Sequence, residues 1–244
     1  MMKMYETDAA TINDKISQKA VALLPVGATE MHGPHLPCGT DSILAERICQ
    51  KLSEKIDAVI LPTVHYTQVW SLGNIVGSIG LSSETLTKTI YELLIEINRN
   101  GFNLIIIVNT HVGNYNIIKE AVRMAYNNND DIQVLYFSYP GAKSKIAEVM
   151  NQNMSSQGFF HADEIETSYM LYLAPEYVDM EKAINESPEI PELIDVTPMR
   201  WSEFTKTAVL GNALDATSEK GKAVIDFVIS EMIRLISDYK GRKK

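Results

Sequence analysis

Short apolar runs alternate with longer amphipathic stretches along most of the chain. The runs rich in aliphatic and β-branched residues predict buried strands at residues 21–26, 58–62, 104–108 and 132–139. The strongest of them, LIIIV at 104–108, is continuously apolar, as parallel strands buried on both faces are.

Between these runs, apolar residues recur every three or four positions, which is the spacing of amphipathic helices. The predicted helices cover residues 41–56, 83–100, 115–127, 142–150, 163–173 and 217–239, after a short leader and helix within 1–20. The stretches predicted to be irregular are a glycine-containing loop at 63–81, a polar and mobile segment at 151–158 and a proline-interrupted segment at 185–200. Strand and helix therefore alternate as in an α/β protein whose parallel sheet is covered on both faces.

Composition narrows the class of protein further. The 244 residues are 45% hydrophobic and 22% charged, and no linker interrupts them, so one domain over 1–244 is expected. A net charge of −9 argues against a general nucleic-acid surface. The chain has no apolar stretch of the ~20 residues that a membrane span needs, so no membrane partner is expected. Its opening residues lack the apolar core of a signal peptide, and a cytoplasmic location is expected.

Three polar clusters contain the chemically versatile side chains. The first strand leads into Glu30-x-His32 and Asp41, the third leads into Asn109-x-His111, and HADEIETS follows at 161–168. The carboxyl ends of neighbouring parallel strands meet at one edge of a sheet, where such proteins bind ligands. Carboxylates and imidazoles without thiolates suit two nearby zinc, manganese or iron ions, and Asp41 is a short carboxylate suited to bridging them.

The residues in these clusters resemble the creatininase, or creatinine amidohydrolase, family of dinuclear metal hydrolases. The matching segments are LPVGATEMHGPHLPCGTD (24–41), NTHVGN (109–114), HADEIETS (161–168) and, more weakly, IVGSIGLSSETL (75–86). The resemblance implies a three-layer α/β/α sandwich and often a hexamer, so a homo-oligomer is expected. It places Glu30, His32, Asp41 and His111 on metal ligands, with Asp41 bridging two divalent ions. It also makes His161 a candidate proton donor to the leaving nitrogen.

One departure from the family pattern concerns the second metal ion. Creatinine-hydrolysing members have a glutamate ligand two residues after the histidine that matches His111, and this chain has Gly113 there. If residues 161–168 are helical, His161, Glu164 and Ser168 share one face, so Glu164 is the predicted replacement ligand. Glu166 would then face the opposite way, and it is the alternative.

The resemblance leaves the substrate open. Trp70, Ser78 and Asn114 are candidate substrate-binding residues, although Trp70 could equally pack in the core and Asn114 could hold its loop. His35 is expected to orient His32 or Asp41 through a hydrogen bond, and His65 to be structural. Because the 66–81 loop differs from the usual family residues, creatinine itself is not the expected substrate.

The function expected from the sequence is a metal-dependent amidohydrolase. It would cleave a non-peptide or cyclic C–N amide bond of a small molecule with a hydroxide that bridges two divalent ions, and His161 would protonate the departing nitrogen. Formylamino-pyrimidine deformylase and peptide-trimming activities of the same family are alternatives. A non-catalytic metal-binding scaffold and a metallophosphoesterase also stand as different classes.

Overall fold

The computed structural model describes residues 1–129, 131–151 and 160–242. Most of the segment at 151–158, which the sequence predicts to be mobile, lies outside these residues. The elements of the central sheet are β1 (Met2–Lys3), β2 (Val21–Val26), β3 (Ala58–Ile60), β4 (Ile105–Asn109) and β5 (Val134–Phe137). They pair in the order β1-β3-β2-β4-β5, and every pairing is parallel. The predicted strands are confirmed, with ends shifted by up to two residues, and the two-residue β1 was not predicted.

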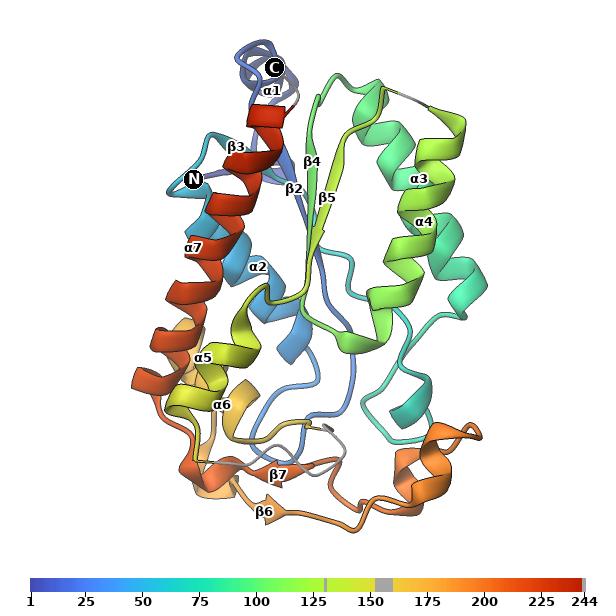
Figure 1. The fold of residues 1–244 in the computed structure, drawn as a ribbon, viewed down its shortest axis with the longest axis vertical. Helices are drawn as coiled ribbons and strands as arrows, with labels where there is room; N and C mark the ends of the chain where they lie inside the picture. Colours follow the sequence, from blue (N-terminus) through green and yellow to red (C-terminus); the bar gives the residue numbers. More distant parts are fainter. Residues whose placement is uncertain (130, 152–159, 243–244) are drawn as a thin grey trace.

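Helices cover both faces of this sheet (Figure 1). On one face lie α2 (Thr40–Ser53), α5 (Ala142–Val149), α6 (Glu164–Leu173) and α7 (Ser218–Arg242). On the other lie α1 (Ala9–Ser17), α3 (Ser83–Arg99) and α4 (Tyr115–Asn128). The α/β/α sandwich predicted from the sequence is thereby confirmed.

Side-chain alternation along the strands explains the two layers. In β4, Ile106 and Val108 belong to the core under α2, α6 and α7, whereas Ile105 and Ile107 belong to the core under α3 and α4. Because successive residues of a strand point to opposite faces, a continuously apolar strand can fill both cores at once.

The long connection between α6 and α7 runs beneath the carboxyl ends of the strands (Figure 1). It contains a small antiparallel ribbon of β6 (Asn185–Glu186) and β7 (Gly211–Asn212) and several short 3-10 turns. The sequence predicts only irregular structure here, at 185–200. Within the described residues, no helix combines the length and apolar character that crossing a membrane requires.

Candidate metal centre

The loop after β2 sits directly on the first turn of α2. A Cβ atom on Gly27 would lie 2.4 Å from the backbone of Ser42, so only glycine allows this close crossing. The Ser42 hydroxyl donates to the carbonyl of Ala28 at 2.9 Å and ties loop to helix. This contact fixes Glu30 and His32, on the loop, against Asp41 in the helix.

Asp41 lies in the first turn of α2, as its sequence context predicts. An anionic side chain is favoured at the positive end of the helix dipole. The hydroxyl of Thr110, just after β4, donates to the Asp41 backbone carbonyl at 2.6 Å. The end of β4 is thereby joined to the helix turn that carries this buried carboxylate.

Three histidine rings around this carboxylate are oriented in the same way. In each ring one nitrogen lies within hydrogen-bond distance of a backbone carbonyl oxygen: His32 Nδ1 of Glu30 (3.0 Å), His111 Nε2 of Gln68 (2.8 Å) and His161 Nε2 of Met31 (2.8 Å). A carbonyl only accepts, so these nitrogens carry the protons. In neutral rings the other nitrogens are then free to coordinate a metal ion.

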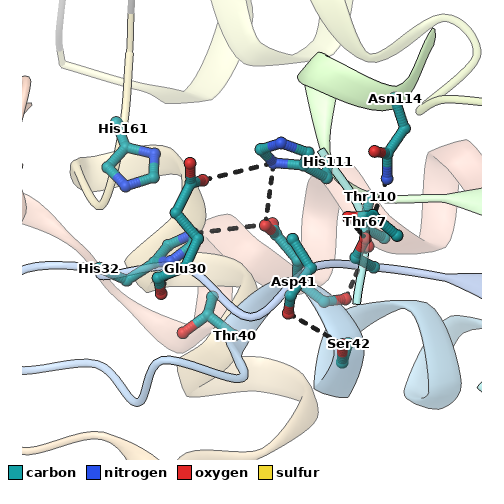
Figure 2. A network of polar contacts seen from close by, with 12 residues as sticks. Glu30, His32, Thr40, Asp41, Ser42, Thr67, Thr110, His111, Asn114 and His161 are labelled. Carbon is teal, nitrogen blue, oxygen red and sulfur yellow. Dashed lines mark hydrogen bonds and ion pairs between the residues drawn. The ribbon is translucent and has the colours of Figure 1, made fainter. Parts of the chain in front are cut away.

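The free nitrogens of His32 and His111 point at the carboxylates (Figure 2). Asp41 Oδ1 lies 3.6 Å from His32 Nε2, and Asp41 Oδ2 lies 3.1 Å from His111 Nδ1. Glu30 Oε2 is 3.4 Å from the same His111 nitrogen, and Glu166 Oε2 is 3.8 Å from His32 Nε2. Each oxygen of Asp41 therefore faces a different histidine, which is the arrangement of a bridging carboxylate.

These side chains form two sets of potential ligands that share Asp41. One set is Glu30, Asp41 and His111, and the other is His32, Asp41 and Glu166; within each set the ligand atoms lie within 4.8 Å of one another. A third grouping of Glu30, His32 and His161 meets the same criterion. Among the described residues, His32 Nε2 and Asp41 Oδ2 are buried without a hydrogen bond. Buried lone pairs that face one another require a cation or a proton between them, so these residues fit a pair of divalent ions.

The electrostatics of the cluster lead to the same conclusion. Burial by itself would lower the pKa of His32, but the carboxylates of Asp41, Glu166 and Glu30 outweigh it and raise this pKa to about 10. Burial also opposes the charged form of His111, and Glu30 and Asp41 raise its pKa to about 9. The cluster thus holds an excess of negative charge that attracts protons when no metal cation is bound.

The structure corrects the predicted role of Glu164. Its carboxylate is fully buried away from the cluster, accepts a hydrogen bond from the Asn151 amide and pairs with Lys220 of α7. Helix α6 begins only at Glu164, where Asp163 caps it by accepting from the amide of Ile165 at 2.9 Å. The helical spacing from His161 to Glu164 therefore does not exist, and Glu166, the alternative, faces the cluster.

His161 lies at the edge of the cluster, where the sequence predicts a proton donor. Its backbone carbonyl accepts from Leu210 at 2.8 Å, in the connection before α7. Its ring packs 4.2 Å from that of His32, and Nδ1 lies 3.9 Å from Glu166 Oε2. Burial and the nearby His32 charge lower the pKa of His161 to about 3.

The predicted substrate-binding residues are not brought together. Asn114 is buried, and its amide donates to the Gly27 carbonyl at 2.9 Å, so it holds the loops. Ser78 accepts from the Met31 amide at 3.1 Å and so supports the loop after β2. Trp70 is 40% exposed and stacks under the guanidinium of Arg200, so it is not a core residue.

His35 and His65 belong to none of the potential ligand sets found among the described residues. The His35 ring bonds to the Thr167 hydroxyl at 2.8 Å rather than to His32 or Asp41, and so anchors the loop to α6. His65 is exposed.

A cavity of about 310 Å³ opens over the cluster. Besides the polar residues already named, it is lined by Gln68, Ser71, Val112, Gly113, Phe160 and Trp201. Gln68, Ser71 and Trp201 were not predicted from the sequence to line a pocket. Trp201 lies 40 residues beyond His161, yet its ring meets the His161 ring edge-on at 5.5 Å.

A family model described as creatininase, creatinine amidohydrolase, matches residues 5–236. The chain belongs to the creatininase family. The family assignment confirms the prediction, made from the three polar segments, of a hydrolase that acts on C–N bonds.

Relatives within the creatininase family have different names. The chain is 29% identical to the creatinine amidohydrolase of Pseudomonas putida over 86% of this chain and 85% of the relative. It is 25% identical to the mycofactocin precursor peptide peptidase of Mycobacterium tuberculosis, with 95% and 90% of the two chains covered. It is 24% identical to the 3-dehydro-scyllo-inosose hydrolase of Thermotoga maritima over 93% and 80%.

A solved mutant creatininase of the Zn-Zn type superposes with a TM-score of 0.87 at 25% identity, covering 97% of each chain. The structure of creatinine amidohydrolase gives the same TM-score at 26% identity. The fold assignment and the expectation of divalent metal ions are consistent with these neighbours.

Proposed function

We propose that this protein is a dinuclear metal-dependent amidohydrolase that cleaves a non-peptide or cyclic C–N amide bond of a small molecule. The observation that carries the proposal is the position of Asp41. Asp41 belongs to two sets of potential ligands, and each of its carboxylate oxygens faces a different histidine. One ion would be held by Glu30, Asp41 and His111, and the second by His32, Asp41 and Glu166.

In this proposal Glu166 would take the place of the glutamate that the creatinine-hydrolysing pattern puts at position 113. A Cβ atom on Gly113 would lie 2.6 Å from His111 Nε2 and 3.0 Å from Gln68 Oε1. A glutamate there would displace the His111 ring, which would hold the first ion. A second ion would therefore draw its carboxylate from Glu166 on α6, whose Oε2 accepts from the Ala162 amide at 2.6 Å.

Two divalent ions in this site would polarise the substrate carbonyl and generate a nucleophile from water at neutral pH. The protein residues supply orientation and proton transfer. The backbone bonds of His32 and His111 keep their free nitrogens fixed on the cluster. His161 holds its Nε2 proton on the Met31 carbonyl, so Nδ1 would accept the proton released from the attacking water and pass it to the departing nitrogen.

The relatives differ in what their names say they act on, so the substrate of this chain is a separate question. Gly113 argues against creatinine, because the creatinine-hydrolysing pattern has a glutamate there, and Gln68 lies against Gly113 in the cavity wall. Peptide trimming is the second candidate, since the mycobacterial peptidase matches over 95% of this chain.

The test combines metal content with a substrate panel. Full-length protein loaded with zinc or manganese should hold close to two ions per chain and hydrolyse small amides or lactams faster than phosphate esters. A set of short peptides tests the second candidate in the same assay. One ion or none after loading would contradict the dinuclear site, and hydrolysis confined to phosphate esters would contradict the amidohydrolase.

A further inference from the structure

A second cavity, which we call the annex, lies beside the metal-cluster cavity and has a different character. Its volume is about 210 Å³. Its wall is mostly apolar and includes Val112, Tyr139, Ala142, Ile146, Phe160 and Tyr169. It lies between the end of β5, the first turns of α5 and the start of α6, and the mechanism proposed above does not use it.

The annex adjoins the metal-cluster cavity. Val112, Phe160 and Glu166 line both spaces, so Glu166 faces the metal cluster and also borders the annex. The two cavities are therefore neighbours with a common wall, and a molecule that spans both would pass Phe160.

The size and wall of the annex suit one ring. The rings of Tyr139 and Tyr169 lie 5.3 Å apart and tilted by 32°, on two different elements. Flat aromatic walls favour a flat apolar guest through stacking or edge contacts. An apolar cavity of about 150 Å³ is known to hold benzene, so a space of this size admits one substituted six-membered ring.

Lys143 carries a charge opposite in sign to that of the carboxylates in the cluster. It lies in the first turn of α5 and is the only lysine or arginine among the described residues that line either cavity. Within the described part of the chain Lys143 makes no ion pair, whereas Lys145 on the same helix pairs with Glu148 at 2.6 Å. An exposed ammonium at the wall of an apolar cavity suits an anionic group at the end of a ring.

We propose that the natural substrate is an amide built on a single ring that carries an anionic group, a carboxylate or a phosphate. The scissile amide would lie at the metal cluster, the ring in the annex against Tyr139 and Tyr169, and the anion against Lys143. The inference rests on the proposed amidohydrolase function and specifies its substrate class.

Three formanilides that share one ring and one amide test this proposal. They are formanilide itself, 4-formamidobenzoate and 4-formamidophenyl phosphate; N-formylglycine has an amide and a carboxylate but no ring. In each hydrolysis, water adds its oxygen to the formyl carbon, the C–N bond breaks and the nitrogen leaves protonated, giving formate and the amine. Binding is measured by ligand-observed NMR, and hydrolysis by formate release, with metal-loaded full-length protein.

The matched variants are Lys143→Ala and Lys145→Ala. Because Lys143→Ala removes a charge-assisted contact, it should weaken binding of the anionic formanilides roughly tenfold. The affinity for formanilide itself should change less than twofold. Lys145→Ala should change none of them. The anion with the larger dependence on Lys143 identifies carboxylate or phosphate as the natural group. N-formylglycine should bind at least about tenfold more weakly than 4-formamidobenzoate, because it leaves the annex empty.

The inference would be overturned if Lys143→Ala weakened binding of the charged and neutral probes equally, or if Lys145→Ala had the same effect. It would also be overturned if N-formylglycine bound as tightly as the ring compounds. Hydrolysis of the panel without dependence on Lys143 would leave the amidohydrolase standing and remove only its substrate class. Lys143-dependent binding with no hydrolysis of any probe would instead contradict the proposed activity.

Discussion

Separate substitutions of Glu166 and Glu164 distinguish a metal ligand from a residue that stabilises the fold. Glu166→Gln removes a negative oxygen that lies 3.8 Å from His32 Nε2 and belongs to one of the two ligand sets. Loss of a residue that merely orients a ligand costs ten- to a hundredfold in metal affinity, so loss of a direct ligand should cost about a hundredfold or more. That corresponds to roughly 2.7 kcal/mol. The bound metal should fall from about two ions per chain to about one.

Glu164→Gln is the matched control, on the same turn of α6. Its carboxylate is buried against Lys220, whose side chain is 17% exposed, so the substitution leaves a cation without its counter-charge. Breaking a fully buried pair costs about 3–5 kcal/mol, and partial exposure reduces this to roughly 2 kcal/mol. For a chain of this size the melting temperature should fall by roughly 4–8 °C. The metal content should stay at the parent value.

The two variants are compared by metal analysis after extensive dialysis and by thermal unfolding. We expect one ion per chain with Glu166→Gln and two with Glu164→Gln. In metal-free protein, Glu164→Gln should lower the melting temperature more than Glu166→Gln does. Two ions in both variants would refute the role of Glu166. Loss of one ion with Glu164→Gln alone would restore the ligand predicted from helical spacing and refute the arrangement described above.

Further predictions concern the metal, the proton donor and a helix contact. Chelation of the metal should lower the melting temperature, because ions at a thousandfold excess over their Kd stabilise the native state by about 4 kcal/mol; an unchanged transition would contradict a site that needs cations. His161→Ala should keep both ions and lower kcat by about 10²–10⁴ with a smaller change in KM, and loss of an ion would make His161 a ligand instead. Gly221→Ala should destabilise the fold by about 1–3 kcal/mol, because its Cβ would lie 1.9 Å from the Ser168 carbonyl oxygen. Gly241→Ala, with open space around it, should not destabilise in the same unfolding experiment.

The sequence by itself determined the layered framework and the edge where the chemistry lies. Apolar runs and helical spacing are local properties, so they located β2, β4 and the helices that follow them. Polar residues directly after the runs at 21–26 and 104–108 had to meet, because the carboxyl ends of neighbouring parallel strands lie side by side. Glu30, His32, Asp41 and His111 were predicted on that basis together with the family motifs.

Only the tertiary structure decided which acidic residue of the third motif faces the cluster. The position of the α6 cap at Asp163 and the left-handed backbone of Ala162, at φ +47°, break the helical phase between His161 and Glu164. These features depend on contacts with Leu210 and with the loop after β2, which a local spacing rule does not contain.

The pocket walls depend on long-range packing even more strongly. Trp201 reaches His161 because Arg200 stacks on Trp70 and Asn74 donates to Ser202 at 2.7 Å, joining segments about 130 positions apart. The annex likewise forms where the end of β5, α5 and α6 converge. A cavity is the space left between elements that pack against one another, so its lining follows from their arrangement in three dimensions and has no periodic signal in the sequence.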